Sequence, residues 1–347
     1  MVKMTFRWYG DSDPVTLEKI RQIPKMTGIV SAVYDVPPGG VWSMESIAAL
    51  KKKAADNGLE FEVVESVPVP EEIKLGSEKA PQLIENYCEN IRRLGKAGVK
   101  CICYNFMPVF DWLRSELEHQ QADGANALAY DDAAVRAMNP LESELSLPGW
   151  DESYSKEELK ELLIRYQDIT EERLWENLKV FLEHVIPVAE KSGIKMAIHP
   201  DDPPWGLFGL PRIITNEENL ERFLKLSDSP ANGLTFCTGS LGASKDNDLP
   251  RMAKKFASRI YFAHLRNILR TGDRQFEEVG HPTDCGSLDM YGIVKSLVEG
   301  GFDGYVRPDH GRMIWGEHGR YGYGLYDRAL GAAYLNGLFE AVEKDFK

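Results

Sequence analysis

The sequence predicts an α/β protein, a single barrel of eight parallel strands alternating with helices, with a long lid-like insertion after the fourth strand. Eight short apolar segments, rich in Val, Ile, Phe and Tyr and bounded by Gly, Pro, Asp or Asn, recur along the chain, and longer amphipathic segments separate them. An open doubly wound sheet usually carries a glycine-rich loop after its first strand, and WYGDSDP (8–14) does not provide one. We therefore expect residues 1–347 to form one (β/α)8, or TIM, barrel domain.

The apolar segments are too short for most helices and have the composition of strands that are buried on both faces. They are TFRWYG (5–10), GIVSAV (28–33), FEVVES (61–66), CICYNF (101–106), KMAIHP (195–200), GLTFCTG (233–239), IYFAHL (260–265) and GYVRPD (304–309). Right-handed βα units repeated eight times close into a barrel.

Amphipathic segments supply the helices. Residues 43–58 form one such segment, with Ser43 as its expected N-cap, and residues 77–98 form another, with Ser77 as its expected N-cap. The longest covers residues 170–193. The segments NEENLERFLKLSD, DLPRMAKKFASR, SLDMYGIVKSLVEGG and DRALGAAYLNGLFEAVEKDF follow the last four predicted strands.

One segment interrupts this alternation. From about 107 to 167, roughly sixty residues separate the fourth predicted strand from its helix, and segments of that length inside compact domains are usually lids or inserted structure. Loops that follow barrel strands lie on the face that holds the active site. We therefore expect an inserted helical segment that covers the site.

Composition excludes several classes of partner. The formal net charge is −13, which disfavours binding to nucleic acid or to anionic lipid. No apolar run approaches the roughly 18 residues of a membrane helix, and MVKMTFRWYGDSD lacks the apolar core of a signal peptide. Five scattered cysteines do not make a disulfide framework. A cytoplasmic protein with reduced thiols is expected.

Four metal-binding side chains stand at the ends of the last four predicted strands. His199, Cys237, His264 and Asp309 each lie within a residue or two of a strand end. A lone buried cysteine is more often a small hydrophobe, as expected for Cys103, but four ligands at one level on neighbouring strands predict a metal site. The set suits Zn²⁺ and also accepts Fe²⁺ or Mn²⁺ where coordination positions stay open. Manganese binds weakest, so a purified sample is prone to carry an adventitious metal such as zinc.

Polar residues beside these ligands are candidates for substrate binding. Arg266 and Asn267 follow the third ligand in HLRN, and Arg307 precedes the fourth by two residues. The planar fork of arginine matches a carboxylate in bidentate fashion, so we expect an anionic substrate. Asn105, at the end of the fourth predicted strand, is a further substrate-binding candidate.

His310 is the candidate for proton transfer. In extended backbone Asp309 and His310 face opposite ways, and Pro308 disfavours regular strand pairing there. Its imidazole, with a pKa that can be tuned near neutrality, suits an acid or base beside the metal. A tyrosine hydroxyl of the following loop is expected to be the second proton carrier, with Tyr323 preferred and Tyr326 as the alternative.

Several stretches together resemble the mannonate dehydratase family: CYNFMPVFDWLRSEL, AIHPDDPP, FCTGSLG, HLRN and VRPDHGR…YGYGLYDRALGA. The similarity extends from MTFRWYG to the last helix. It implies a barrel of the xylose-isomerase-like group that converts D-mannonate to 2-keto-3-deoxy-D-gluconate and water in hexuronate (glucuronate) catabolism, using Mn²⁺ or Fe²⁺. It also implies that the four ligands hold the metal, that His310 and a loop tyrosine transfer protons, and that the protein is a homodimer.

The chemistry of a sugar-acid dehydration agrees with these parts. A barely acidic carbon-bound proton must be removed next to a carboxylate, which calls for Lewis-acid stabilisation, and the departing hydroxyl must be protonated. Either His310 or the tyrosine is compatible with either proton transfer. Two alternatives stay open: a metal-dependent sugar isomerase or epimerase on the same barrel, and a non-catalytic protein with a closed structural zinc site.

Overall fold

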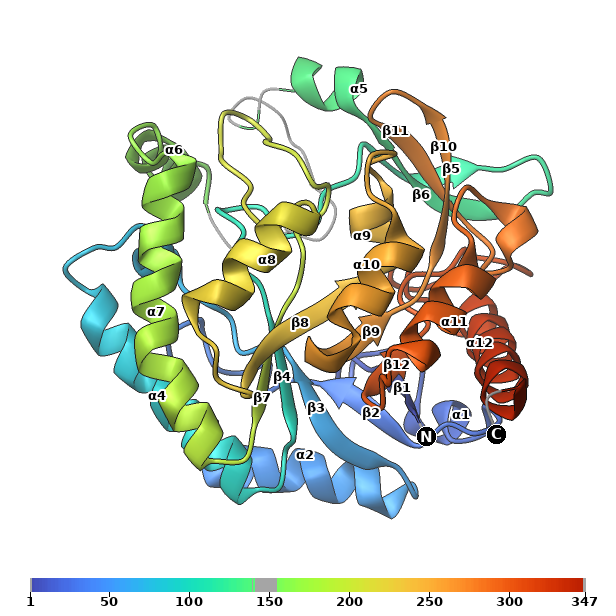
Figure 1. The fold of residues 1–347 in the computed structure, drawn as a ribbon, viewed down its shortest axis with the longest axis horizontal. Helices are drawn as coiled ribbons and strands as arrows, with labels where there is room; N and C mark the ends of the chain where they lie inside the picture. Colours follow the sequence, from blue (N-terminus) through green and yellow to red (C-terminus); the bar gives the residue numbers. More distant parts are fainter. Residues whose placement is uncertain (1, 139, 141–154, 346–347) are drawn as a thin grey trace.

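The structure, a computed structural model, describes residues 2–138, 140 and 155–345 of the chain. Eight parallel strands close a barrel in the order β1-β12-β9-β8-β7-β4-β3-β2, and helices surround it (Figure 1). The barrel strands are β1 (Lys3–Arg7), β2 (Gly28–Ser31), β3 (Glu60–Glu65), β4 (Cys101–Tyr104), β7 (Lys195–Ile198), β8 (Asn232–Cys237), β9 (Ile260–His264) and β12 (Tyr305–Arg307). One strand overlaps each predicted segment, so the predicted barrel is confirmed.

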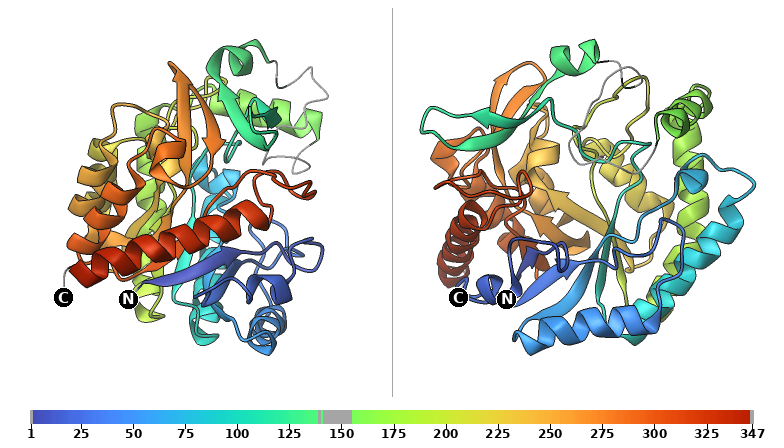
Figure 2. Two further views of the ribbon diagram at one scale, coloured as in Figure 1. Left: turned by 90° about the vertical axis from the view of Figure 1, so that its right-hand side faces the viewer. Right: turned by 180° about the vertical axis from the view of Figure 1, so that it is seen from behind.

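The barrel closes through its first strand. β1 pairs with β12 on one side, Met4 opposite Val306, and with β2 on the other, Thr5 opposite Gly28. The first strand therefore runs beside the last, and both views of Figure 2 show the two termini close together. This pairing brings the end of β1 to the same mouth of the barrel as the end of β12.

All eight barrel strands end earlier than the sequence predicted, and two of these ends bear directly on the site. β1 ends at Arg7, so its last predicted residues belong to the loop that follows. β12 ends at Arg307, because Pro308 has no N–H to donate to a neighbouring strand. Asp309 and His310 therefore lie on a loop, where the alternation of side chains along a strand does not constrain them.

The helices after the barrel strands are α1 (Leu17–Ile20), α2 (Met44–Asp56), α3 (Glu71–Lys74), α4 (Ala80–Lys96), α7 (Glu171–Lys191), α8 (Glu217–Leu226), α9 (Thr238–Gly242), α10 (Leu249–Phe256), α11 (Met290–Glu299) and α12 (Tyr326–Asp345). The predicted cap of α2 is confirmed, since the Ser43 hydroxyl accepts a hydrogen bond from the backbone N–H of Ser46. The predicted cap of α4 is wrong, because that helix begins at Ala80 and not after Ser77. Pro81 lies in its first turn, where a missing N–H costs nothing.

The insertion after β4 contains strands as well as helices. Within residues 107–167 lie β5 (Glu116–Gln120), β6 (Asn126–Asp131), α5 (Asp132–Ala137) and α6 (Lys156–Tyr166). Residues 139 and 141–154 of this segment lie outside the described residues. The sequence predicted the insertion but not its hairpin.

A second hairpin follows β9 and consists of β10 (Asn267–Gly272) and β11 (Gln275–Val279). β6 pairs with β11, Tyr130 opposite Phe276, so the two hairpins form one antiparallel sheet in the order β10-β11-β6-β5. In Figure 1 this sheet lies beside the barrel at the upper right. Both hairpins follow the C-terminal ends of barrel strands, the face on which TIM barrels carry their active sites. Within the described residues, no helix is long and apolar enough to cross a membrane.

Candidate active site

The ends of four adjacent barrel strands bring the four predicted metal ligands together. His199 follows β7, Cys237 and His264 end β8 and β9, and Asp309 follows β12. Ligand atoms of His199, Cys237 and His264 lie within 4.8 Å of one another. An oxygen of Asp309 lies 3.5 Å from the sulfur of Cys237, and its other oxygen lies 3.8 Å from Nδ1 of His264.

The chemistry of these side chains fits a divalent first-row metal. His264 is fully buried, its Nε2 has no hydrogen-bond partner among the described residues, and its Nδ1 lies 3.1 Å from Nε2 of His199. Burial, reinforced by Arg307, lowers the pKa of His264 well below its usual value, so the ring is neutral as a ligand requires. Burial raises the pKa of Cys237 to about 12 in the absence of a cation, and a bound metal would stabilise the thiolate.

A second group of donors shares His264. Ligand atoms of Glu65, Cys103 and His264 also lie within 4.8 Å of one another. Oε2 of Glu65 lies 3.6 Å from Nε2 of His264 and has no hydrogen-bond partner among the described residues. Glu65, His199 and Asp309 line a pocket at the mouth of the barrel. Cys103, which was expected to be a packing residue only, lines the same pocket, and its sulfur accepts a hydrogen bond from the hydroxyl of Thr235.

His310 and Tyr323 form one hydrogen-bonded pair at the edge of this pocket. Nε2 of His310 lies 2.9 Å from the hydroxyl of Tyr323, and both side chains are buried. Burial raises the pKa of Tyr323 well above its usual value, so the phenol keeps its proton. The other tyrosine considered, Tyr326, is the first residue of α12, is 42% exposed, packs against Trp315 and does not line the pocket.

Two predicted substrate-binding residues are already engaged elsewhere. Nε, Nη1 and Nη2 of Arg266 donate to Asp309, Glu278 and Asp202, so all three nitrogens already have carboxylate partners. Arg266 does not line the pocket. Asn267 is also buried and does not line it: its amide N–H donates to a backbone carbonyl, and its oxygen accepts two backbone N–H groups. Spacing next to a ligand did not reveal that these side chains do not line the pocket.

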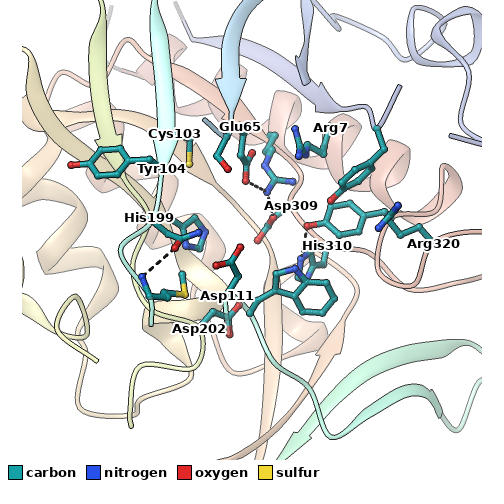
Figure 3. A pocket seen from close by; sticks show the side chains of 17 residues that line it. Arg7, Glu65, Cys103, Tyr104, Asp111, His199, Asp202, Asp309, His310 and Arg320 are labelled. Atoms are coloured by element: carbon teal, nitrogen blue, oxygen red, sulfur yellow. Dashed lines mark hydrogen bonds and ion pairs between the residues drawn. The ribbon is translucent and has the colours of Figure 1, made fainter. Parts of the chain in front are cut away.

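Arg307 and Arg7 present unused hydrogen-bond donors at the pocket. Nη2 of Arg307 pairs with Asp309 at 2.7 Å and with Glu65 at 3.1 Å, whereas its Nε and Nη1 are buried without partners among the described residues. Nη1 of Arg7 is likewise buried without a partner there. Arg7 packs over the ring of Tyr9 at 4.5 Å. In Figure 3, Arg7, Glu65, His199 and Asp309 point into the same pocket from the ends of different barrel strands or the loops just after them.

The insertion after β4 forms one wall of the pocket. Asn105, a predicted substrate-binding residue, lines the pocket at the start of this wall, and its side-chain oxygen accepts the N–H of Met107. Asp111 and Trp112 also line the pocket, and the indole ring of Trp112 lies 5.0 Å from the imidazole of His310.

Sequence reasoning missed Arg7 and Glu65, although a signal was present. Each is a charged residue at the C-terminal end of a barrel strand, β1 for Arg7 and β3 for Glu65. Glu278 was missed as well: it lies on β11, and its carboxylate contacts Nδ1 of His310 at 2.8 Å. No comparable signal marked Glu278, because its strand was not predicted.

Comparison with known proteins identifies the family. The model of the family described as D-mannonate dehydratase (UxuA) matches residues 2–347. Mannonate dehydratase 2 of Halalkalibacterium halodurans is 56% identical over 343 residues, which are 98% of this chain and 99% of that protein. The crystal structure of mannonate dehydratase from Streptococcus suis serotype 2 has a TM-score of 0.93 at 49% identity and covers 99% of this chain and 96% of its own.

A more distant structure shows the fold alone. A xylose isomerase-like TIM barrel protein from Mycobacterium smegmatis is 14% identical, with a TM-score of 0.55 over 94% of this chain and 87% of its own. The match over the whole chain, together with the barrel and its metal-binding donor set, bears out the resemblance seen in the motifs: the chain belongs to the D-mannonate dehydratase family of metal-dependent hydro-lyases.

Proposed function

We propose that the pocket shown in Figure 3 carries out the family's reaction, the dehydration of D-mannonate to 2-keto-3-deoxy-D-gluconate and water. One observation carries this proposal: two arginines with unpaired N–H groups, a hydrogen-bonded His–Tyr pair and the metal-binding donors His199 and Asp309 line a single pocket. Ligand atoms of Cys237 and His264 lie within 4.8 Å of the ligand atom of His199. Dehydration of a sugar acid needs a Lewis acid, a cation for the carboxylate and a proton-transfer system, and the pocket contains side chains suited to each.

His199, Cys237, His264 and Asp309 are the proposed metal ligands. When bound, a divalent metal supplies Lewis-acid stabilisation of the negative charge that develops beside the substrate carboxylate. Burial alone would raise the pKa of Asp309, but Arg307 and its other charged neighbours outweigh burial and lower that pKa well below the usual value. The carboxylate is thus ionised before a metal binds. Mn²⁺ or Fe²⁺ is the proposed metal, with Zn²⁺ as an adventitious occupant.

Arg307 and Arg7 are the proposed partners of the substrate carboxylate. Three of their buried N–H-bearing nitrogens have no acceptor among the described residues, and an unpaired buried donor is costly unless a ligand satisfies it. A carboxylate has two oxygens that accept such hydrogen bonds in bidentate fashion. Arg307 also contacts Asp309, so the bound carboxylate would lie next to the metal ligands.

His310 and Tyr323 are the proposed proton carriers. The proton at C2 leaves to one member of the pair, and the hydroxyl at C3 departs with a proton as water. The resulting enol takes up a proton at C3 and loses its hydroxyl proton, which gives the 2-keto acid. Because Nε2 of His310 and the hydroxyl of Tyr323 share a hydrogen bond, a proton accepted at one can be delivered from the other. Trp112 covers the imidazole and helps to exclude water from this exchange.

The test is to incubate the Mn²⁺-loaded and the Fe²⁺-loaded protein with D-mannonate and follow the product by NMR. Release of a 2-keto-3-deoxy acid is expected, whereas recovery of an isomeric sugar acid would replace this proposal with an isomerase or epimerase. Elemental analysis of freshly purified protein identifies the bound metal. Removal of the metal should abolish turnover and keep the fold, and unfolding on chelation would instead indicate a closed structural zinc site.

We further propose that residues 1–347 act as one barrel domain, with the segment at about 107–167 as a lid. We also propose a homodimer in the cytoplasm that has a sugar acid as its partner and binds neither nucleic acid nor membrane. The net charge of −13 supports the last point, because it repels polyanionic surfaces. Light scattering coupled to size-exclusion chromatography tests the dimer.

A further inference from the structure

Glu278 reaches the proton-transfer pair from outside the barrel. It lies on β11 in the four-stranded sheet, and its side chain is 2% exposed. Its two carboxylate oxygens lie 2.8 and 3.0 Å from Nδ1 of His310. His310 therefore has a partner on each ring nitrogen, Glu278 on Nδ1 and Tyr323 on Nε2.

Two buried arginines hold Glu278 in place. Nη2 of Arg114 and Nη1 of Arg266 each donate to its Oε1 at 2.7 Å. Burial alone would raise the pKa of Glu278, but the guanidinium groups of Arg266 and Arg114 outweigh burial and lower that pKa below its usual value. The carboxylate is therefore ionised and can only accept hydrogen bonds.

The charge on Glu278 determines where a neutral His310 ring carries its proton. Since an ionised carboxylate must receive a donor, the proton lies on Nδ1, and Nε2 is left with its lone pair. That lone pair faces the hydroxyl of Tyr323, which is protonated and donates to it at 2.9 Å. The opposite tautomer would place a lone pair against the carboxylate and lose both contacts.

We propose that Glu278 is a positioning residue that fixes the ring orientation and the Nδ1–H tautomer of His310, so that Nε2 accepts a hydrogen bond from the hydroxyl of Tyr323. Its consequence for turnover rests on the proposed function, whereas its effect on the tautomer does not. The insertion after β4 and the hairpin after β9 would then both contribute to the orientation of His310. Arg114 comes from the insertion after β4 and Glu278 from the hairpin after β9, and the pairing of β6 with β11 joins these two segments.

Glu278→Gln tests this assignment because only one end of the amide can accept. The two guanidinium groups draw the amide oxygen to the Oε1 position, where its two lone pairs accept their N–H groups and none is left for Nδ1 of His310 at 2.8 Å. The amide nitrogen takes the Oε2 position, 3.0 Å from Nδ1. Two donors then face each other unless the ring moves its proton to Nε2. In that tautomer Nε2 donates to Tyr323 and no longer accepts from it.

The first readout is ¹⁵N NMR of the metal-free protein labelled at histidine, with the His310 signal assigned by its loss in His310→Asn. At a pH high enough for the ring to be neutral, the parent should show a protonated Nδ1 and an unprotonated Nε2, and Glu278→Gln should show the reverse. The second readout is turnover of D-mannonate by the metal-loaded protein, for which kcat should fall about 10²- to 10⁴-fold while KM changes less than about threefold.

Glu277→Gln is the matched control. Glu277 is the preceding residue of the same strand, so its side chain points to the other face, where it pairs with His119 at 2.9 Å. This control should keep the parent tautomer and the parent kcat. An unchanged tautomer in Glu278→Gln would overturn the inference.

Glu278→Asp is the second test of the positioning role, for use if the glutamine variant does not fold. It keeps the negative charge for Arg114 and Arg266 but withdraws the carboxylate from His310 by one methylene group. A fall in kcat with a parent-like melting temperature supports the positioning role, and parent-like kcat overturns it. If the parent protein does not turn over D-mannonate, the proposed function fails, and the NMR tautomer still decides whether Glu278 orients His310.

Discussion

Arg7→Met is expected to weaken binding of D-mannonate and leave the stability of the protein almost unchanged. Nη1 of Arg7 is buried without a hydrogen-bond partner, and no carboxylate in the described part of the chain forms an ion pair with its guanidinium group. The group lies over the rings of Tyr9 and Tyr34 at 4.5 and 5.8 Å. Arg7 thus carries a buried positive charge that the substrate carboxylate would neutralise.

The expected loss of affinity for D-mannonate follows from the one unpaired donor of Arg7, its Nη1. A hydrogen bond to a charged group contributes about 1.5–3 kcal/mol, so its loss should weaken binding about 10- to 150-fold. For folding, two effects oppose each other: the contacts with the two rings contribute about 1–2 kcal/mol, and the unpaired buried donor costs about 1–3 kcal/mol. Their near cancellation predicts a change of less than about 1 kcal/mol in the free energy of unfolding.

The assay is calorimetric titration in a His310→Asn background, in which the metal is expected to bind while turnover is lost. D-mannonate is compared with D-mannitol, a neutral polyol of similar size, and thermal unfolding is followed in parallel. Arg173→Met, which removes an exposed arginine paired with Glu176, is the control and should bind D-mannonate like its background. The reasoning is refuted if Arg7→Met also binds it like the background, or if both ligands lose affinity equally.

Three further predictions concern single side chains. Cys237→Ser should lose most of the bound metal, measured by elemental analysis, and full metal content with full activity would remove the thiolate from the site. His310→Asn should keep the metal and lower kcat about 10²- to 10⁴-fold, and loss of the metal would make His310 a ligand. Tyr323→Phe should lower kcat strongly while Tyr326→Phe stays within about twofold, since Tyr326 is exposed outside the pocket; equal kcat values for the two variants would contradict this assignment.

The barrel could be predicted because each of its strands can be recognised from a short stretch of sequence. Each strand is a short apolar run with turn residues at its ends, and the proposed ligands His199, Cys237, His264 and Asp309 stand at or just after those ends. Parallel strands that close a barrel must present their C-terminal ends at one mouth. Proximity of the four side chains thus followed from strand positions alone.

The rest of the site depends on contacts that sequence position does not encode. Arg266 and Arg307 were equivalent candidates in the sequence. In the structure, Arg266 donates hydrogen bonds to three carboxylates, whereas Nε and Nη1 of Arg307 have no partner among the described residues. The strand that bears Glu278 was not predicted, because polar residues dominate QFEEV and its apolar pattern is weak. Its partner β6 lies more than a hundred residues earlier in the chain, a pairing that no local pattern reveals.

The balance of charge around the pocket explains why it suits a substrate with one carboxylate. A largely buried ion-pair network consists of three arginines and four carboxylates: Arg114, Arg266, Arg307, Glu65, Asp202, Glu278 and Asp309. Arg7, which has no carboxylate partner among the described residues, brings the sum of these charges to zero. Asp111 and Arg320, which also line the pocket, are of opposite sign and cancel when Asp111 is ionised. A divalent metal bound with the thiolate of Cys237 adds one positive charge, and a monocarboxylate restores neutrality. A neutral polyol would leave that charge unpaired at low dielectric, which is costly. We therefore expect selectivity for a sugar acid to depend on Arg7 as well as on the proposed metal ligands.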